Sequence, residues 1–190
     1  MNSENAASRL IDQQSIREVV LRLCQALDRK DIAGIRNAYH VDATDVHGAF
    51  EGNVDSFIAW FEKRHAPIPF SMHMVGNILI DFVDENHALA ETYNWVVQTY
   101  PESAKDSLAQ FVGKDVLAKG GEFDFLGCGR YLDRFEKRDG EWKILRRTLV
   151  SGRKIVLPAS VLHEPHSGWI TDRRDADDAL YTERRAMGIN

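Results

Sequence analysis

FSMHMVGNILIDFVDENHALAETYNWVVQTY, residues 70–100, contains two long apolar-rich runs on either side of the turn-favouring triplet Asp84-Glu85-Asn86. Runs of this kind that flank a turn predict a β-hairpin. A second pair of runs, FDFLGCGRYLDRFEKR and EWKILRRTLVSGRKIVL, surrounds Asp139-Gly140, and an Asp-Gly pair favours a tight hairpin turn. The sequence therefore predicts several long antiparallel strands in its second half.

Helical periodicity precedes the first hairpin. Over residues 12–29, apolar side chains recur at the spacing of an α-helix: Ile16, Val20, Leu23, Cys24 and Leu27. Asp31 has the position of an N-cap for a second helix, and Asn53 or Asp55 could cap a third. Helices followed by strands, rather than alternating with them, indicate an α+β fold with helices on one face of a sheet. A curved sheet covered in this way would enclose a pocket for a small ligand.

Two stretches lack clear periodicity. Residues 101–123 are polar and contain glycine, and a long loop, a short helix and a lid all fit the pattern. The chain from Pro158 on is charged and punctuated by proline. We therefore expect one domain over residues 1–157 and a partly helical tail over residues 158–190 that packs on this domain or on a neighbouring subunit.

The composition limits the classes of function. The chain has 190 residues, of which 44% are hydrophobic and 28% charged, as in a soluble globular domain with a sizeable core. Its net charge of −5 disfavours a nucleic-acid partner and an anionic membrane surface. No apolar run is long enough to cross a bilayer, the first residues lack the plan of a signal peptide, and the two cysteines lack CxxC spacing. We expect a cytoplasmic protein.

The other histidines give no metal-site pattern. His40, Asp45 and His47 lie close in sequence, and His163 and His166 lie in the tail. None of them forms an HxH pair on a strand or an HExxH motif on a helix. We expect no metal site.

His73 is the single histidine in the apolar run of residues 70–82. Strand alternation places it on one face with Val75, Asn77 and Leu79. On a helical wheel, Asp28 falls inside the apolar arc of the first helix. One interpretation is structural, with His73 bonded to a backbone carbonyl and Asp28 reaching water at a frayed helix end. The other is that Asp28 orients His73 as a general base, and the spacing leaves both open.

Three segments together resemble the SnoaL-like branch of the nuclear transport factor two-like superfamily: LCQALDRKDIAGIRNAYHVDATDVHGAFEG, SMHMVGNILID and GRYLDRFEKRDGEWKILRRTLV. The similarity spans roughly residues 10–157. It implies a cone-shaped α+β barrel, in which a strongly curved antiparallel sheet and N-terminal helices close a deep pocket. It also implies a homo-oligomer, a trimer or dimer, formed through the outer face of the sheet.

Two enzymes of this branch, scytalone dehydratase and hexachlorocyclohexane dehydrochlorinase, are similar to this chain in a first-helix Asp and a strand His. These positions fall on Asp28 and His73. The resemblance implies that the dyad abstracts a proton while a leaving group departs, with no metal or organic cofactor. A lysine that the dehydrochlorinase carries on this helix is replaced by Leu23, and its pocket arginine matches Arg130.

Further pocket residues are expected from the same arrangement. Arg130 would stabilise developing negative charge, or would form a surface ion pair. Asn77 could hydrogen-bond the substrate or a buried backbone group. Apolar side chains would form the walls for a hydrophobic ligand, or would belong to the core: Leu23, Phe57, Trp60 and Trp95.

These residues favour a cofactor-independent lyase of the dehydratase type, or an isomerase, acting on a small hydrophobic, cyclic or polyketide-like molecule. Loss of halide is less favoured because Leu23 replaces the lysine. The alternative is a non-catalytic ligand-binding or assembly module, such as the small subunit of a ring-hydroxylating dioxygenase.

Overall fold

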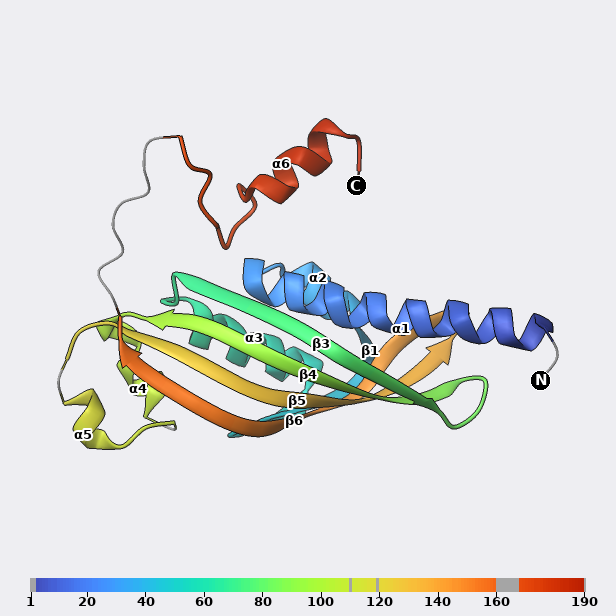
Figure 1. Ribbon diagram of the computed structural model, residues 1–190, viewed down its shortest axis with the longest axis horizontal. Helices are drawn as coiled ribbons and strands as arrows, with labels where there is room; N and C mark the ends of the chain where they lie inside the picture. The colour runs from blue at the N-terminus through green and yellow to red at the C-terminus, as the bar shows by residue number, and fades with distance from the viewer. Residues whose placement is uncertain (1–2, 110, 119, 160–167, 190) are drawn as a thin grey trace.

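The computed structural model describes residues 3–109, 111–118, 120–159 and 168–189. Its centre is one six-stranded sheet in the order β2-β1-β6-β5-β4-β3, so that β2 and β3 form the two edges. Figure 1 shows the long strands bending together, with α1 running along them. Helix α1 packs against β3 and β6, and α3 packs against β1 and β2. The predicted α+β class, a curved sheet with N-terminal helices, is confirmed.

The helices are α1 (Ser3–Arg29), α2 (Ile32–Asn37), α3 (Val54–His65), the 3₁₀ turn η1 (Glu102–Ala104), α4 (Lys105–Leu108), α5 (Lys114–Leu117) and α6 (Ala179–Ala186). The strands are β1 (Tyr39–His47), β2 (Phe50–Asn53), β3 (Phe70–Phe82), β4 (His87–Tyr100), β5 (Phe123–Arg138) and β6 (Glu141–Pro158). Within the described residues, no helix is long and apolar enough to cross a membrane.

Both predicted hairpins are present. Strands β3 and β4 pair antiparallel across the Asp84–Asn86 turn, and β5 and β6 pair antiparallel across Asp139-Gly140. Asp139 and Gly140 both have positive φ, 52° and 84°, as a type I′ turn requires. The sheet is nevertheless mixed, because β1 returns from the helical region and runs parallel to β6. That pairing differs from the purely antiparallel sheet expected from the sequence.

Side-chain caps fix the starts of the short helices. The Asp31 carboxylate accepts a hydrogen bond from the Gly34 amide at 2.9 Å, which confirms it as the N-cap of α2. At α3 the cap is Asn53 rather than Asp55, since its side chain accepts from the Ser56 amide at 2.9 Å. Helix α1 begins earlier than the periodicity indicated, at Ser3 rather than near residue 12.

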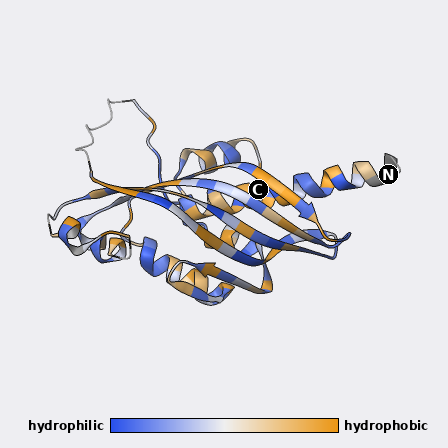
Figure 2. Cartoon of the chain, turned by 60° about the horizontal axis from the view of Figure 1, so that its bottom comes forward, coloured by the Kyte–Doolittle hydropathy of each residue, from blue (hydrophilic) through white to orange (hydrophobic). Residues whose placement is uncertain are grey.

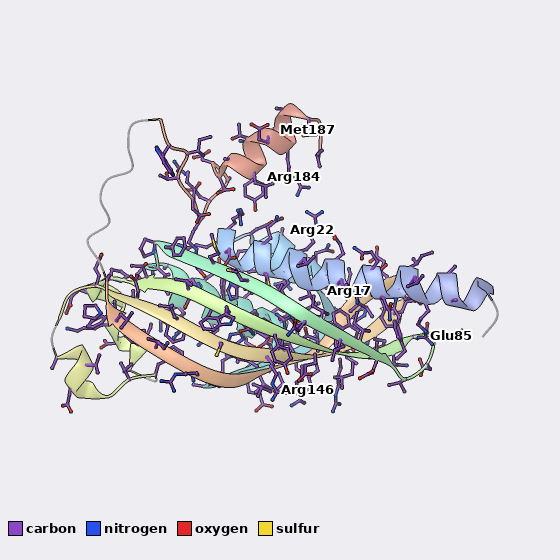
Figure 3. All side chains as sticks on the ribbon, in the orientation of Figure 1. Arg17, Arg22, Glu85, Arg146, Arg184 and Met187 are labelled. Carbon is purple, nitrogen blue, oxygen red and sulfur yellow. The ribbon has the colours of Figure 1, made fainter. Side chains whose placement is uncertain are left out.

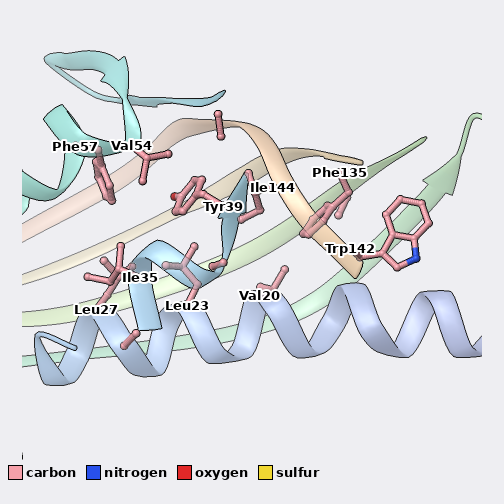
Figure 4. Packing of buried hydrophobic residues seen from close by; sticks show 14 of the residues in the cluster. Val20, Leu23, Leu27, Ile35, Tyr39, Val54, Phe57, Phe135, Trp142 and Ile144 are labelled. Atoms are coloured by element: carbon pink, nitrogen blue, oxygen red, sulfur yellow. The ribbon is translucent and has the colours of Figure 1, made fainter. Parts of the chain in front are cut away.

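The main core lies between α1, α2, α3 and the sheet. Figure 4 shows apolar side chains from these elements meeting there: Val20, Leu23, Leu27, Ile35, Tyr39, Val54, Phe57, Phe135, Trp142 and Ile144. Burying a large apolar side chain contributes roughly 1.5–3 kcal/mol, so this cluster holds α1 on the sheet. The Trp142 indole donates to Asp12 at 2.8 Å, which joins β6 to the first half of α1. Apolar and polar residues alternate along the long strands (Figure 2).

A β-bulge interrupts β3 at Asn77. The pairing with β4 shifts between Gly76 and Ile78, and Asn77 has a φ of 48°. A bulge adds one unpaired residue, so side chains beyond it change face. Ile78 therefore packs against the core, while Leu79 is 63% exposed. The strict alternation predicted for residues 73–79 was wrong beyond this point.

Residues 101–123 fold into η1, α4 and α5 within the part described. They contribute to a second apolar cluster, which consists of Ile68, Tyr100, Ala104, Leu108, Phe123 and Phe125. After the sheet, described residues 168–189 come back to the C-terminal end of α1 (Figure 1), where Arg29 pairs with Asp178 at 3.1 Å. His163 and His166 lie outside the described residues. Charged side chains surround the sheet and helices on the outside, among them Arg22, Glu85 and Arg146 (Figure 3).

Candidate active site

Asp28 and His73 meet between the last turn of α1 and the start of β3. The His73 Nδ1 lies 2.6 Å from Asp28 Oδ1, although the two residues are 45 positions apart in sequence. The backbone amide of His73 donates to Asp28 Oδ2 at 2.8 Å, so the carboxylate holds both the ring and its strand. Both side chains are largely buried, with 8% of His73 and 11% of Asp28 exposed.

The Asp28 carboxylate is part of a longer hydrogen-bonded chain. The Ser71 hydroxyl donates to Asp28 Oδ1 at 3.2 Å, and the Gln98 amide donates to Ser71 at 3.1 Å. The Tyr100 hydroxyl donates in turn to Gln98 at 2.8 Å. Because a carboxylate accepts at His73 Nδ1, that nitrogen carries the proton and Nε2 is the ring nitrogen that can accept another.

The end of α1 places Asp28 by a regular helix-termination motif. Lys30 adopts a φ of 54°, and the Asp31 amide donates back to the Ala26 carbonyl at 2.9 Å. This is the Schellman arrangement, which stops a helix and leaves other terminal carbonyls to be satisfied elsewhere. Arg174 of the tail satisfies two of them, at 2.9 Å from the Leu27 carbonyl and 2.7 Å from the Asp28 carbonyl.

The same arginine reaches two further groups. It donates to the Ile68 carbonyl at 2.9 Å and lies 3.1 Å from His65 Nδ1. Arg174 is only 7% exposed, and burial lowers its pKa to about 10. Burial, together with Arg174 and Arg64, lowers the pKa of His65 to about 2, so this imidazole is neutral. His65 stacks on Phe61 with ring centroids 4.2 Å apart.

His73 lines a pocket with an empty volume of about 880 Å³, including the part that opens to solvent. The walls are mainly aromatic: Phe57, Trp60, Phe61, Phe111, Phe125 and Tyr131. Polar side chains on the same walls are His47, Arg64, His65, Asn94, Gln98, Ser151 and Lys154. A largely apolar cavity with a few polar groups is typical of a site for a small organic ligand.

Asn94 is a polar residue of this pocket that has spare hydrogen-bonding capacity, as is His47, whose Nδ1 has no hydrogen-bond partner among the described residues. Asn94 is 5% exposed, and its Nδ2 also has no hydrogen-bond partner within the part of the chain that the structure describes. A buried donor without a partner is costly unless a ligand or a water satisfies it. Strand alternation could have found it, because Thr92, Asn94 and Gln98 share one face of β4 and all three are buried.

The structure brings some predicted site residues together and separates others. Phe57 and Trp60 line the pocket beside His73. Leu23 is fully buried in the main core instead. Trp95 is 51% exposed on the outer side of β4.

Arg130 and Asn77 also lie away from the pocket. Arg130 forms an ion pair with Glu91 on the neighbouring strand, which corresponds to the surface interpretation. The inward residue at this point of β5 is Tyr131. Asn77 is exposed at the β-bulge, which turns it off the face that it was expected to share with His73. The predicted place of these two residues in the pocket was wrong.

Acidic groups and histidines outside the dyad are side chains of the kinds that bind metal ions. No cluster of three or more His, Cys, Asp or Glu side chains with metal-binding geometry occurs in the described part of the chain. His47 Nδ1 lies 3.4 Å from Asp45 Oδ1, and the other Asp45 oxygen accepts from the Tyr39 hydroxyl at 2.7 Å.

Solved structures with this fold include enzymes of elimination chemistry. A scytalone dehydratase-like protein from Novosphingobium aromaticivorans matches with a TM-score of 0.63 and 19% identity, over 86% of this chain and 98% of that one. Hexachlorocyclohexane dehydrochlorinase LinA type 2 matches with a TM-score of 0.67 and 14% identity, over 86% and 99%. A protein from N. aromaticivorans described as similar to aromatic ring hydroxylases matches with a TM-score of 0.61 and 18% identity, over 78% and 94%. At these identities the matches show a shared fold.

No curated protein matches the sequence. A family model does, and its match runs from residue 8 to residue 148, which takes in both members of the dyad and most of the sheet. The chain therefore belongs to the family of SnoaL-like domains.

Proposed function

We propose that this protein is a cofactor-independent lyase or isomerase that removes a proton from carbon in a small hydrophobic substrate. The observation that carries the proposal is the 2.6 Å pairing of Asp28 with His73 on the wall of an aromatic-lined pocket. Family membership and the fold shared with a dehydratase-like protein and a dehydrochlorinase support it.

His73 Nε2 takes the proton in this mechanism. Asp28 fixes the tautomer through Nδ1 and stabilises the imidazolium that forms. In an elimination, the electrons of the broken C–H bond form a double bond, and the leaving hydroxide takes the proton back from the His73 imidazolium and departs as water, which restores the neutral imidazole. If the proton returns to a different carbon instead, the product is an isomer.

Asn94 takes the role that the sequence assigned to Arg130 or Asn77. Its unpartnered Nδ2 can donate to the carbonyl oxygen that activates the C–H bond, where negative charge develops. Removal of one such donor typically costs about 10²- to 10³-fold in rate. We therefore expect Asn94→Leu to lower turnover by about that factor while the protein stays folded.

The test of the proton abstraction uses His73→Gln and Asp28→Asn with a panel of cyclic β-hydroxyketones. Solvent-deuterium exchange and the absorbance of the conjugated product report the two halves of the reaction. We expect the turnover of each variant to fall by about 10²- to 10⁴-fold, which is the usual contribution of a positioned general base.

A second His–Asp pair provides the matched control. His87 Nδ1 lies 2.9 Å from Asp84 in the exposed β3–β4 turn, outside the pocket. His87→Gln should leave turnover unchanged. Full turnover in a folded His73→Gln protein would refute the proposal.

A non-catalytic binding or assembly module is the second candidate. The shared fold with the ring-hydroxylase-like protein favours it. Such a module has no need of a buried dyad that faces a pocket, so the lyase is preferred. Stoichiometric copurification with an oxygenase large subunit, together with inactivity on every substrate of the panel, would favour the module.

A further inference from the structure

Two cationic side chains line the pocket without an anionic partner. Arg64 comes from the last turn of α3 and Lys154 from β6. Arg64 donates to the Tyr100 hydroxyl at 3.0 Å and to the Ser107 carbonyl at 3.3 Å. Lys154 donates to the Ser151 hydroxyl. Within the described chain, neither cation forms an ion pair with a carboxylate.

Both cations contact the ring of Phe111. The guanidinium carbon of Arg64 lies 5.6 Å from the Trp60 ring centroid and 5.5 Å from that of Phe111. The Lys154 ammonium lies 5.1 Å from the centroid of the same Phe111 ring. Cation–π contacts are weak, and they attract a cation without neutralising its charge.

The rest of the lining does not supply the missing charge. No Asp or Glu occurs among the described residues that line the pocket. Asp28 lies behind His73, and its carboxylate already accepts from Ser71, His73 Nδ1 and the His73 amide. The pocket is thus positive although the chain as a whole carries a net charge of −5. A positive pocket in an acidic protein attracts and retains an anionic ligand.

We propose that the substrate carries a carboxylate, bound jointly by Arg64 and Lys154, on an otherwise apolar ring system. The inference rests on the proposed function, because it names the substrate class of the same pocket. Arg64 has five N–H donors, and its bonds to Tyr100 and Ser107 leave others for a planar carboxylate. The aromatic walls of Phe57, Trp60 and Phe125 take the apolar part.

The experiment compares two probes of equal shape, 2-naphthoate and 2-naphthamide. Binding to the full chain is measured at low ionic strength by calorimetry, because salt weakens the electrostatic part. We expect naphthoate to bind at least tenfold more tightly than naphthamide. Arg64→Gln and Lys154→Gln should each reduce this preference severalfold, and the double variant should abolish it.

Arg153→Gln is the matched control, since it removes an exposed charge next to Lys154 but outside the pocket lining. It should keep the full preference, and circular dichroism checks the fold of each protein. If Arg64→Gln does not fold, Arg64→Lys keeps the charge and should keep most of the preference. Equal binding of both probes to the natural protein, or a preference that survives in the double variant, overturns the proposal.

His73→Gln separates this inference from the proposed reaction. The variant should still prefer naphthoate, because binding of the carboxylate does not use the dyad. If His73→Gln keeps full turnover while the naphthoate preference depends on Arg64 and Lys154, the lyase mechanism fails and the anion site stands.

Discussion

Two buried carboxylates of this protein each have a basic partner, but the two partners differ in their chemistry. Asp28 lies 2.6 Å from His73, and Asp133 receives two hydrogen bonds of 2.7 Å from Arg147 on the neighbouring strand. Asp133 and Arg147 are 0% and 1% exposed, so this second pair is sealed in the sheet. Arg147 also covers the Tyr131 ring at 4.0 Å.

The difference lies in what the basic partner can do. Burial alone would lower the pKa of Arg147, but Asp133 and Tyr39 outweigh it and raise the pKa well above its usual value. Arg147 therefore keeps its proton and cannot act as a base. The His73 ring has a second nitrogen, Nε2, that can accept a proton, and His73 faces the pocket. A buried carboxylate with a basic partner thus serves structure in one place and, in our proposal, chemistry in the other.

The largest effect on stability is expected for Arg147→Met. It leaves the Asp133 carboxylate buried without its partner, which costs about 3–5 kcal/mol in the free energy of unfolding. His73→Gln should change the same quantity by only about 1 kcal/mol. Urea unfolding of both variants measures the contrast.

The double variant Asp133→Leu/Arg147→Met sharpens this result. It removes both charges from the same place, and such replacements are often neutral or stabilising. We expect it to regain most of the stability that Arg147→Met loses. A single variant as stable as the natural protein would show that Asp133 does not need its arginine.

The sequence predicted the helices and strands better than it predicted how the strands pair and which of their side chains face the core. The hairpins follow from local signals such as Asp139-Gly140, and the caps follow from Asp31 and Asn53. The parallel return of β1 beside β6 is a long-range pairing that no local pattern indicates. The bulge at Asn77 depends on the fit between β3 and β4, and it reversed the faces of the residues that follow.

In the candidate site, too, some residues could be predicted from the sequence and others could not. The helical wheel and the strand alternation left the pairing of Asp28 with His73 open, and the family resemblance favoured it; the structure brings the two residues together. Arg130 was placed by alignment alone, and one residue of shift exchanges it for Tyr131 on the pocket wall. Arg174 could not be found from the sequence, because its contacts with α1 span about 146 positions and require the tail to fold back.

Replacement of Arg174 by Ala should lower the free energy of unfolding by a smaller amount, about 3 kcal/mol. The variant leaves the Asp28 and Ile68 carbonyls without their donor, and the Leu27 carbonyl with only the Lys30 amide at 3.5 Å, at the point where α1 presents the dyad. Stability to urea should fall, and turnover on the substrate panel should fall with it. Arg173→Ala is the control, since Arg173 pairs with Asp175 on the surface and solvent-exposed pairs contribute little to stability. Equal losses in the two variants would contradict a specific role for Arg174.

The smallest effect concerns the pH dependence that His65 creates beside Arg174. Its pKa of about 2 in the folded protein, caused first by burial, compares with about 6.5 in the unfolded chain. Below pH 6.5 the unfolded chain binds a proton at His65 that the folded protein does not bind. The contribution of the neutral His65 to the free energy of unfolding is therefore fully present above pH 6.5. It falls as the pH decreases, by roughly 1 kcal/mol per pH unit between pH 6 and 4.5. Urea unfolding at several pH values measures this slope.

His65→Gln should remove that part of the slope, because glutamine does not titrate. His87→Gln serves as the control, since His87 is exposed beside Asp84. This variant should show the same decrease in the free energy of unfolding at acid pH as the natural protein. Arg174→Ala should flatten the slope partway, because it removes a cation 3.1 Å from His65 and lets the imidazole accept a proton in the folded state. A slope that is the same in His65→Gln and in the natural protein would mean that other groups produce it. A slope that changes with both His65 and Arg174 would show that the tail sets the protonation of the pocket wall as well as the position of Asp28.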